Sequence, residues 1–192
     1  MKLDRNYWEA QYLIKQTGWD LGYPSPPLVE YIDQLTHKDI RILVPGAGNA
    51  WEVEYLWKMG FWNTYLLDFS STAIERFKKR VPEFPADHIF EEDFFKHQKT
   101  YDLVLEQTFF SSLLPEQREK YVCKMHEILS GGGKLVGVVF NHEFSFEGPP
   151  FGATPESYIS LINPYFGIEV FEEAFNSIKP RKGREHFLIA RR

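Results

Sequence analysis

A run of small residues lies where a ligand could approach the main chain closely. Residues 44–48 (VPGAG) follow an apolar stretch and precede a helical pattern that begins near Trp51. Gly46 and Gly48 carry no side chains, so backbone N–H groups at the start of the helix stay accessible, as in many nucleotide-binding α/β proteins. A Gly-x-Gly pair alone also occurs in ordinary turns. The loop therefore predicts a ligand site only in combination with other residues.

Two acidic residues follow this loop, at the ends of the next two apolar stretches. Asp68 lies about 20 residues beyond the loop, where a carboxylate can accept hydrogen bonds from both ribose hydroxyls. Asp93 can bond an adenine amino group, and the neighbouring Phe94 can cover the adenine face. The simpler alternatives are that Asp68 caps the following helix beside Ser70, and that Asp93 belongs to the acidic surface run 91–93. Because the glycine loop, Asp68 and Asp93 each follow an apolar stretch in turn, together they predict a nucleoside ligand.

Trp51 argues against a dinucleotide ligand. A NAD-binding fingerprint has its third glycine at this position, where the helix must pack closely on the strand and leave space for a pyrophosphate. A nucleoside ligand without phosphate, such as S-adenosylmethionine, has less need of that glycine. A nicotinamide-dependent reductase is therefore an alternative that Trp51 disfavours.

The elements that position these residues alternate between strand and helix after about residue 40, the pattern of a parallel sheet with crossover helices. We expect strands at 40–45, 64–68, 88–90, 101–105 and 134–140. The expected helices are 51–59, 73–80, 115–129 and 155–161. Two last strands, 167–170 and 186–190, have no helix between them, so we expect an antiparallel hairpin at the edge of a mostly parallel seven-stranded sheet.

Length and composition favour one globular domain over residues 1–192, since 43% of the residues are hydrophobic. Within it, residues 1–38 are expected to form a helical cap of two helices over the ligand edge of the sheet. The net charge of −5 argues against nucleic acid as a partner. The longest apolar runs, such as 135–140, are far shorter than the roughly 20 residues of a membrane span.

The cellular compartment and the metal content follow from similar counts. The N-terminal residues MKLDRNYWEAQYLIKQ lack the continuous apolar stretch of a signal peptide. Cys123 is the only cysteine, so no disulfide forms within the chain. The six histidines are scattered without metal-ligand spacing. We therefore expect a cytoplasmic protein without a bound metal.

Taken in order, several short strings resemble one family. The whole chain resembles the thiopurine S-methyltransferase family, and within it most closely the plant-type halide, thiocyanate and thiol methyltransferases. The strings that carry the resemblance are Tyr7-Trp8-Glu9 with Tyr12 and Trp19, Leu43-Val44-Pro45-Gly46-Ala47-Gly48, Leu67-Asp68-Phe69-Ser70, Asp93-Phe94-Phe95, Thr108-Phe109-Phe110, Gly148-Pro149-Pro150 and Pro180-Arg181-Lys182-Gly183-Arg184-Glu185.

The resemblance implies a Rossmann-like class I methyltransferase, a three-layer sandwich that uses S-adenosylmethionine and releases S-adenosylhomocysteine. Its partner would be a small soft nucleophile, namely a thiol, hydrosulfide, thiocyanate or halide, and the chain would act as a monomer. Tyr12 stands where the family has tryptophan, and Gln107 where relatives have tyrosine. These departures motivate an alternative, a cofactor-binding module without catalysis. The implied cofactor-binding residues are Trp8, Tyr12, Trp19, Gly46, Gly48, Asp68, Asp93, Phe94 and Gln107.

An aromatic wall also suits this cofactor on physical grounds. A sulfonium carries a fixed positive charge, which an aromatic face attracts by roughly 0.5–2 kcal/mol. Trp8 and Trp19 could supply such faces. The alternative is that both tryptophans only anchor an N-terminal helix to the core.

The candidates for the methyl-transfer step follow the fourth and fifth strands. Glu106 is a candidate polar group near the transferred methyl or the methionine end of the cofactor, and Phe109, with Phe110 and Phe151, could form a dry acceptor pocket. Helix capping and ordinary core packing are the alternatives for these residues. Little acid–base machinery is needed, because the methyl group of the cofactor is already activated.

A basic cluster near the C-terminus is the candidate site for a negatively charged acceptor. Arg181 is the first candidate, since arginine is a strong donor to anions, and Lys182 and Arg184 lie beside it. His142 could act as a base near the site. The alternative for the cluster is a solvated hairpin loop.

Overall fold

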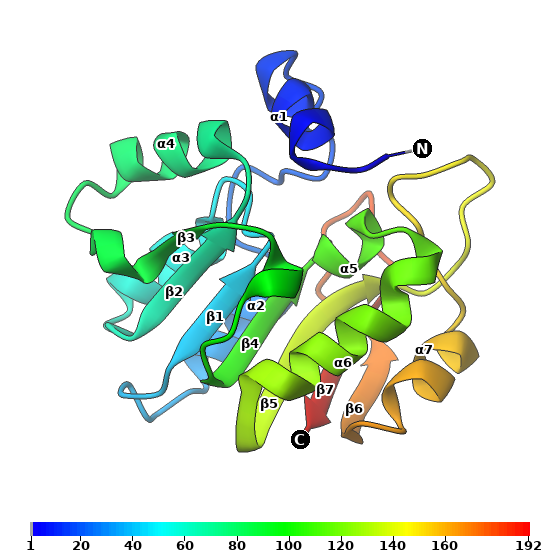
Figure 1. Cartoon of the computed structure of the whole chain (residues 1–192). Helices are drawn as coiled ribbons and strands as arrows, with labels where there is room; N and C mark the ends of the chain where they lie inside the picture. Colours follow the sequence, from blue (N-terminus) through cyan, green and yellow to red (C-terminus); the bar gives the residue numbers. More distant parts are fainter. Residues whose placement is uncertain (1) are drawn as a thin grey trace.

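A seven-stranded sheet lies between two layers of helices in the computed structural model, which describes residues 2–192 (Figure 1). The strand order is β3-β2-β1-β4-β5-β7-β6. The first five strands are parallel, and β7 lies antiparallel between β5 and β6. The mixed sheet with an antiparallel edge that the sequence predicts is therefore confirmed. The strands are β1 (Ile42–Pro45), β2 (Thr64–Asp68), β3 (Ile89–Glu91), β4 (Tyr101–Gln107), β5 (Leu129–Phe140), β6 (Gly167–Glu173) and β7 (Glu185–Arg191).

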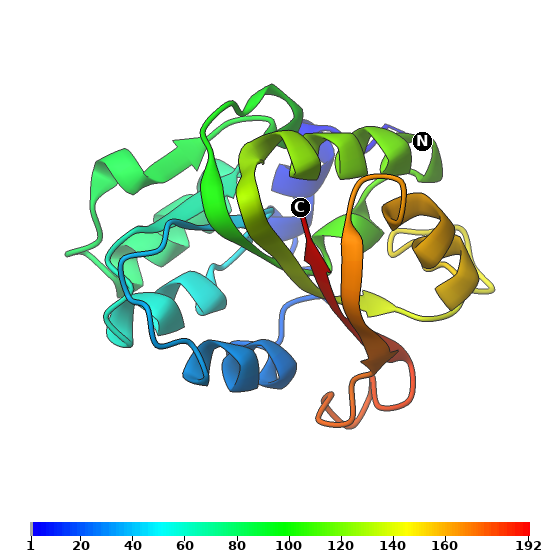
Figure 2. The same cartoon turned by 90° about the horizontal axis from the view of Figure 1, so that it is seen from below.

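Each face of the sheet has its own hydrophobic core, because side chains alternate along a strand. Ile42 and Val44 face one helical layer, whereas Leu43 faces the other, and all three are buried. The two layers lie on opposite sides of the sheet in the view from below (Figure 2). One layer holds α2 (Pro26–Asp33), α3 (Trp51–Lys58) and α4 (Ser71–Arg80), and the other holds α5 (Phe109–Ser112), α6 (Arg118–Ile128) and α7 (Pro155–Ile162).

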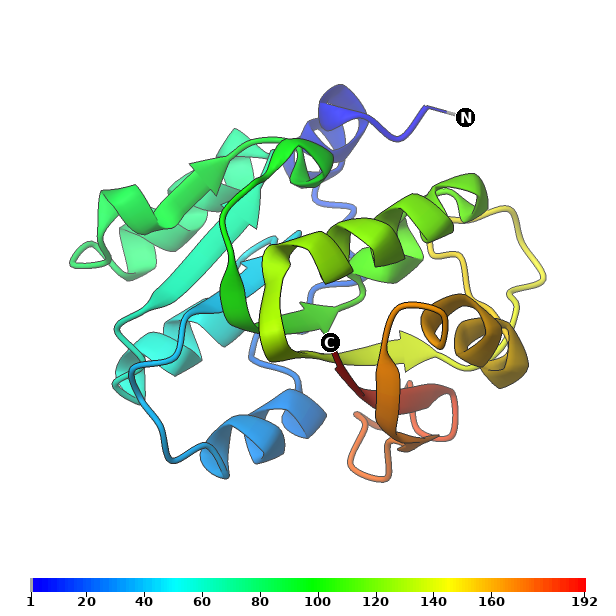
Figure 3. The same cartoon turned by 60° about the horizontal axis from the view of Figure 1, so that its bottom comes forward.

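The strand order reverses beside β1, which pairs with β2 on one side and β4 on the other. The chain leaves β1 toward β2 and β3, then crosses back to continue at β4. The loops after β1 and β4 therefore diverge, and a crevice forms at the carboxyl ends of these strands. The β6–β7 hairpin lies at the opposite edge from β3 (Figure 3).

The two N-terminal helices lie in different places. The helix α1 (Arg5–Leu13) stands beyond the carboxyl ends of the strands and contacts α4 (Figure 1). By contrast, α2 packs on a face of the sheet against α3 and β5. The expectation that both helices cover the ligand edge is therefore wrong for α2. Leu28 and Ile32, four residues apart on one side of α2, are fully buried in the core below it.

The largest difference in element boundaries lies between α6 and β5. The sequence predicts a helix from 115 to 129 and a strand from 134, but α6 begins at Arg118 after a 3₁₀ turn, and β5 begins at Leu129. Leu129 pairs with Tyr101, and the register shifts before the next pair. The glycines at 131–133 give no local sign of a strand, so only the pairing across the sheet defines it. Within residues 2–192 no helix has the length and apolarity to cross a bilayer.

Candidate functional site

A cavity of about 1240 Å³ opens at the carboxyl ends of the strands. Its walls come from α1, the loop after β1, the end of β2, the segment after β3, α5, the loop after β5 and the segment before β7. Three predicted site residues do not border it, namely Gly48, Glu106 and Gln107. The predicted residues that border it are Trp8, Tyr12, Trp19, Gly46, Asp68, Asp93, Phe94, Phe109 and Arg181.

The loop after β1 requires its two glycines. Gly46 and Gly48 have φ values of +57° and +55°, a region that strains other residues. A Cβ on Gly46 would overlap the ring of Phe109, and one on Gly48 would lie 2.7 Å from the Tyr12 hydroxyl oxygen. The loop is therefore covered by aromatic rings from α5 and α1.

Asp68 holds this loop in place. Its Oδ2 accepts a hydrogen bond of 2.8 Å from Gly48 N, and its Oδ1 accepts one of 2.8 Å from Ser70 N. Burial raises the pKa of Asp68, and the backbone hydrogen bonds oppose this effect. The carboxylate therefore joins the end of β2 to both the glycine loop and the start of α4. It also borders the cavity.

Three aromatic side chains form the wall that α1 and the segment after it contribute. Trp8 and Trp19 make an edge contact with ring centroids 5.2 Å apart, and Tyr12 meets Trp19 in the same way at 5.6 Å. Tyr12 is buried, and this burial raises its pKa. The ring that replaces the expected tryptophan thus keeps the packing of the wall.

Asp20, which the sequence analysis missed, fixes the segment after α1. It accepts a hydrogen bond of 2.7 Å from Trp51 Nε1 and another from Asn49 Nδ2. The guanidinium of Arg80 lies 4.0 Å from the centroid of the Trp51 ring. Trp51 therefore packs between Asp20 and Arg80 at the position that a NAD-binding loop gives to glycine. The sequence feature that could have identified Asp20 is its position directly after Trp19, a predicted cofactor-binding residue.

The segment after β3 supplies the opposite wall. Asp93 is exposed and accepts a hydrogen bond of 3.0 Å from Phe95 N, and Phe94 is buried with its ring 5.2 Å from that of Phe109. The sequence analysis missed Glu92, which borders the cavity and contacts the buried His97 at 2.5 Å. His97 also contacts the hydroxyl of Tyr101 at 2.7 Å.

Glu106 lies below α5 instead of in the cavity. Its Oε1 accepts a hydrogen bond of 2.6 Å from Phe110 N, and the side chain is buried. Burial raises the pKa of Glu106 to about 8. Glu106 does not border the cavity, because its carboxyl caps the start of α5, and its assignment near the transferred methyl or the methionine end stays a prediction. Phe110 belongs to the core beside it and does not border the cavity.

Two arginines border the other end of the cavity. Arg181 donates a hydrogen bond of 3.0 Å to Trp19 O and forms an ion pair of 3.3 Å with Glu185. Arg184 contacts His142 Nε2 at 2.9 Å and forms no ion pair within the described residues 2–192. Burial and the Arg184 charge lower the pKa of His142. Three residues that the sequence placed here do not border the cavity: His142, Phe151 and Lys182.

A side pocket of about 30 Å³ adjoins the cavity beside the glycine loop. Trp19, Gly46 and Thr108 border both spaces. Gln107 and Asn49 border the side pocket, and Gln107 Nε2 and Asn49 Oδ1 are buried without hydrogen-bond partners in the described chain. Gln107 thus contributes a buried donor and Asn49 a buried acceptor beside the side pocket, each without a partner in the described chain. Groups of three or more metal-ligating side chains are absent from residues 2–192.

Residues 3–189 match the family described as thiopurine S-methyltransferase (TPMT). The chain belongs to this family. It is an S-adenosylmethionine-dependent methyltransferase, and the resemblance inferred from the sequence is confirmed.

Relatives of this methyltransferase in plants cover most of its length. It is 30% identical to the probable thiol methyltransferase 2 of Arabidopsis thaliana, over 93% of this chain and 81% of that protein. It is 28% identical to the thiocyanate methyltransferase 1 of Brassica oleracea, over the same shares of the two chains.

A solved structure has a similar fold. The 1,6-didemethyltoxoflavin-N1-methyltransferase of Burkholderia thailandensis, solved with S-adenosylhomocysteine, superposes with a TM-score of 0.74 over 99% of this chain and 87% of that chain. The two sequences are 14% identical, so the comparison supports the fold alone.

Proposed function

We propose that this methyltransferase transfers a methyl group to a small, soft, anionic nucleophile, a thiolate, hydrosulfide, thiocyanate or halide ion. The observation that carries this proposal is the end of the cavity bordered by Phe140, Phe144, Pro149 and Arg184. There an apolar wall lies beside a cation, Arg184, that has no ion pair within residues 2–192. A soft anion suits such a surface, because it is weakly hydrated and still attracted by positive charge. The names of the plant relatives, thiol and thiocyanate methyltransferase, support the same class.

The residues around the glycine loop fit the nucleoside part of S-adenosylmethionine. Asp68 borders the cavity and uses one lone pair of each oxygen for a backbone N–H, which leaves the others for ribose hydroxyls. We assign the adenine to the space between Phe94 and Asp93, since both border the cavity at the end of β3. The two left-handed glycines allow the ligand to approach the main chain.

The polar atoms beside the side pocket are complementary to the amino-acid part of the same cofactor. Gln107 Nε2 is a buried donor and Asn49 Oδ1 a buried acceptor, and both lack partners in the described chain. A carboxylate and an ammonium group are complementary to these two atoms. We therefore assign the methionine carboxylate to Gln107 and the methionine ammonium to Asn49.

Replacing Gln107 with leucine tests this assignment. The substitution keeps the approximate size but removes the donor, and a hydrogen bond to a charged group is worth about 1.5–3 kcal/mol, so the dissociation constant of S-adenosylhomocysteine should rise roughly 10- to 100-fold. Isothermal titration calorimetry measures this change. Gln98→Leu, at an exposed position away from the cavity, is the control and should bind as the wild type does. Unchanged affinity in Gln107→Leu would remove Gln107 from the cofactor site.

The work of the protein in the reaction is alignment and the exclusion of water. Bound S-adenosylmethionine supplies a methyl group that its sulfonium charge has already activated. Trp8 and Trp19 present aromatic faces at the cavity wall, which favour a positive charge. Phe109 and Phe144 keep the acceptor end apolar, so a nucleophile bound there loses water. Anionic acceptors need no general base.

Arg184 is expected to attract the acceptor. Arg181 already carries Glu185 as a counter-ion, whereas the facing group of Arg184 is His142, whose pKa is lowered by burial and the Arg184 charge. Replacing Arg184 with glutamine should therefore raise the KM for thiocyanate roughly 10-fold and leave the affinity for S-adenosylhomocysteine unchanged. Lys182→Gln, which removes a nearby cation that does not border the cavity, is the matched control.

The assay follows S-adenosylhomocysteine formed from hydrosulfide, thiocyanate, iodide, small thiols and an aromatic thiol. Turnover of at least one soft anion is the expected result. A protein that binds S-adenosylhomocysteine but turns over none of these acceptors would instead be a cofactor-binding module. Equal KM values in the Arg184→Gln and Lys182→Gln variants would show that Arg184 does not select the acceptor.

A further inference from the structure

The helix α1 is held over the cavity by aromatic contacts with Trp19 and by several polar contacts. Tyr12 is its only buried residue, and Leu13 and Ile14 at its end are 67% and 58% exposed. Apart from Tyr12 and the half-buried Tyr7 and Trp8, burial of apolar side chains therefore contributes little to the position of this helix. Trp8 and Tyr12 nevertheless border the cavity, so the position of α1 decides whether their rings cover it.

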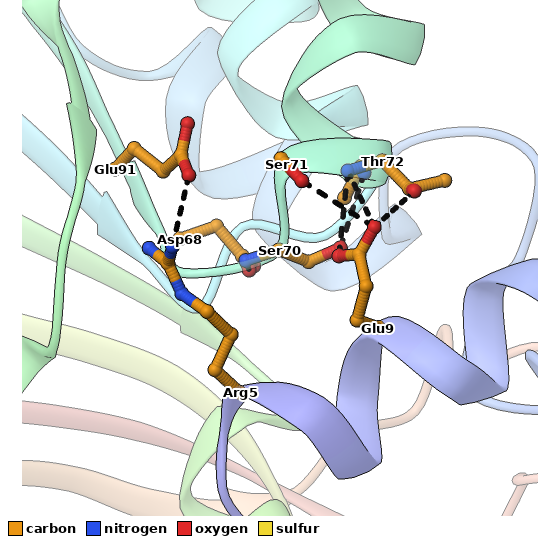
Figure 4. Close-up of polar contacts among 8 residues, drawn as sticks. Arg5, Glu9, Asp68, Ser70, Ser71, Thr72 and Glu91 are labelled. Carbon is orange, nitrogen blue, oxygen red and sulfur yellow. Dashed lines mark hydrogen bonds and ion pairs between the residues drawn. The ribbon is translucent and has the colours of Figure 1, made fainter.

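The strongest of these polar contacts is made by Glu9 with the start of α4 (Figure 4). Glu9 Oε2 accepts a hydrogen bond of 2.7 Å from Ser70 Oγ. Glu9 Oε1 accepts one of 3.2 Å from Thr72 N and another from Thr72 Oγ1. The first N–H groups of a helix have no partners within the helix and favour a negative charge. Glu9 thus supplies, from a different helix, the carboxylate that α4 lacks in its own first turn.

Ser70 connects this contact to the cofactor site. Its hydroxyl donates to Glu9, and its backbone N–H donates to Asp68 Oδ1 at 2.8 Å. The second oxygen of Asp68 holds Gly48 N. A continuous chain of hydrogen bonds therefore runs from α1 through the start of α4 to the glycine loop. Glu9 itself does not border the cavity.

The other contacts of α1 are fewer. Arg5 pairs with Glu91 at 3.1 Å, but these side chains are 49% and 42% exposed, and such pairs are typically worth about 0–1 kcal/mol. At the C-terminal end of α1, Arg76 Nη2 donates a hydrogen bond of 2.9 Å to Tyr12 O. Glu9 alone combines several hydrogen bonds with a link to Asp68.

We propose that Glu9 is a positioning residue for cofactor binding, which anchors α1 on α4 so that Trp8 and Tyr12 cover the cavity and Asp68 stays oriented. This inference rests on the proposed placement of S-adenosylmethionine in the cavity. Glu9 touches neither the cofactor nor the acceptor. Its effect is on how long the cofactor stays bound.

Glu9→Ala removes the anchor without weakening α1, because alanine has the highest helix propensity. The dissociation constant of S-adenosylhomocysteine should rise roughly 10-fold, mainly through faster dissociation, which stopped-flow tryptophan fluorescence measures. Hydrogen exchange should show lost protection of residues 5–13 while the sheet keeps its protection. Thr72→Val, which removes one donor from the other side of the contact, should change both readouts in the same direction but less.

Glu75→Ala is the matched control, because Glu75 lies exposed on α4 and pairs only with Lys78 of the same helix among the described ion pairs. Both its cofactor affinity and its α1 protection should equal those of the wild type. The proposal is overturned if Glu9→Ala and Thr72→Val bind the cofactor normally, or if α1 keeps its protection in both. Hydrogen exchange of the ligand-free protein tests the contact between Glu9 and α4 without any cofactor. This test therefore remains valid even if S-adenosylmethionine does not bind in the cavity as proposed.

Discussion

Replacing Asp68 with asparagine should raise the dissociation constant of S-adenosylhomocysteine by about 100-fold or more. Both oxygens of Asp68 accept a backbone N–H, one from Gly48 and one from Ser70. An asparagine amide has a single acceptor oxygen, so its NH₂ group must face one of these N–H donors, and a buried donor left without a partner costs about 1–3 kcal/mol. The proposed hydrogen bonds to ribose weaken in addition. Calorimetry and urea denaturation measure the two effects.

The control for this prediction is a carboxylate at the other end of the strands, away from the cavity. Asp102, near the start of β4, pairs with Arg41 at 3.0 Å, and its pKa is lowered to about 2, chiefly by that partner. Asp102→Asn should cost stability without a change in cofactor affinity, because Asp102 does not border the cavity. Normal binding by Asp68→Asn would mean that Asp68 serves only as the cap of α4, the simpler alternative that the sequence left open.

The glycine loop and the acidic strand ends could be placed from sequence because they depend on short-range rules. Each parallel strand ends at the same edge of the sheet, so residues that directly follow an apolar stretch converge there. Gly46, Asp68 and Phe94 lie at such positions and border one cavity. The spacing along the chain was sufficient, and no distant contact had to be known.

Contacts between distant segments could not be predicted in this way. Arg181 donates to Trp19 O across 162 positions, and Asp20 reaches Trp51 across 31. The Glu9 contact with Thr72 spans 63. These side chains meet because α1 and the segment after it fold back over the sheet edge, and no periodicity within either partner encodes that approach.

The direction of the Glu106 side chain follows from the sequence once the alternation along its strand is considered. Side chains alternate along β4, so that Leu103 and Leu105 face the layer of α2 to α4, whereas Val104 faces the layer of α5 to α7. Glu106 therefore points under α5, and Gln107 points toward the side pocket. Position at the end of a strand indicated a site, but the alternation decides which of two neighbours can reach the ligand.

The buried position of Glu106 gives a second large effect, on stability as a function of pH. Burial raises the pKa of this carboxyl from 4.5 to about 8, so the folded protein holds a proton that the unfolded chain releases above pH 4.5. The free energy of unfolding should then fall by about 1.4 kcal/mol for each pH unit between 4.5 and 8, and level off above 8. Below pH 4.5 both states hold the proton, and the group contributes no slope.

Glu106→Gln should remove this dependence, because the amide is neutral at every pH and its oxygen can still accept from Phe110 N. The variant should gain about 3 kcal/mol over the wild type between pH 5 and pH 7, measured by urea denaturation at each pH. Asp102→Asn again serves as the control, since Asp102 is ionised in both states above pH 5 and its stability loss should be constant. A difference between Glu106→Gln and wild type that does not change with pH would mean that Glu106 is ionised in the folded protein. A charged carboxylate at this buried position would need water or a cation beside it.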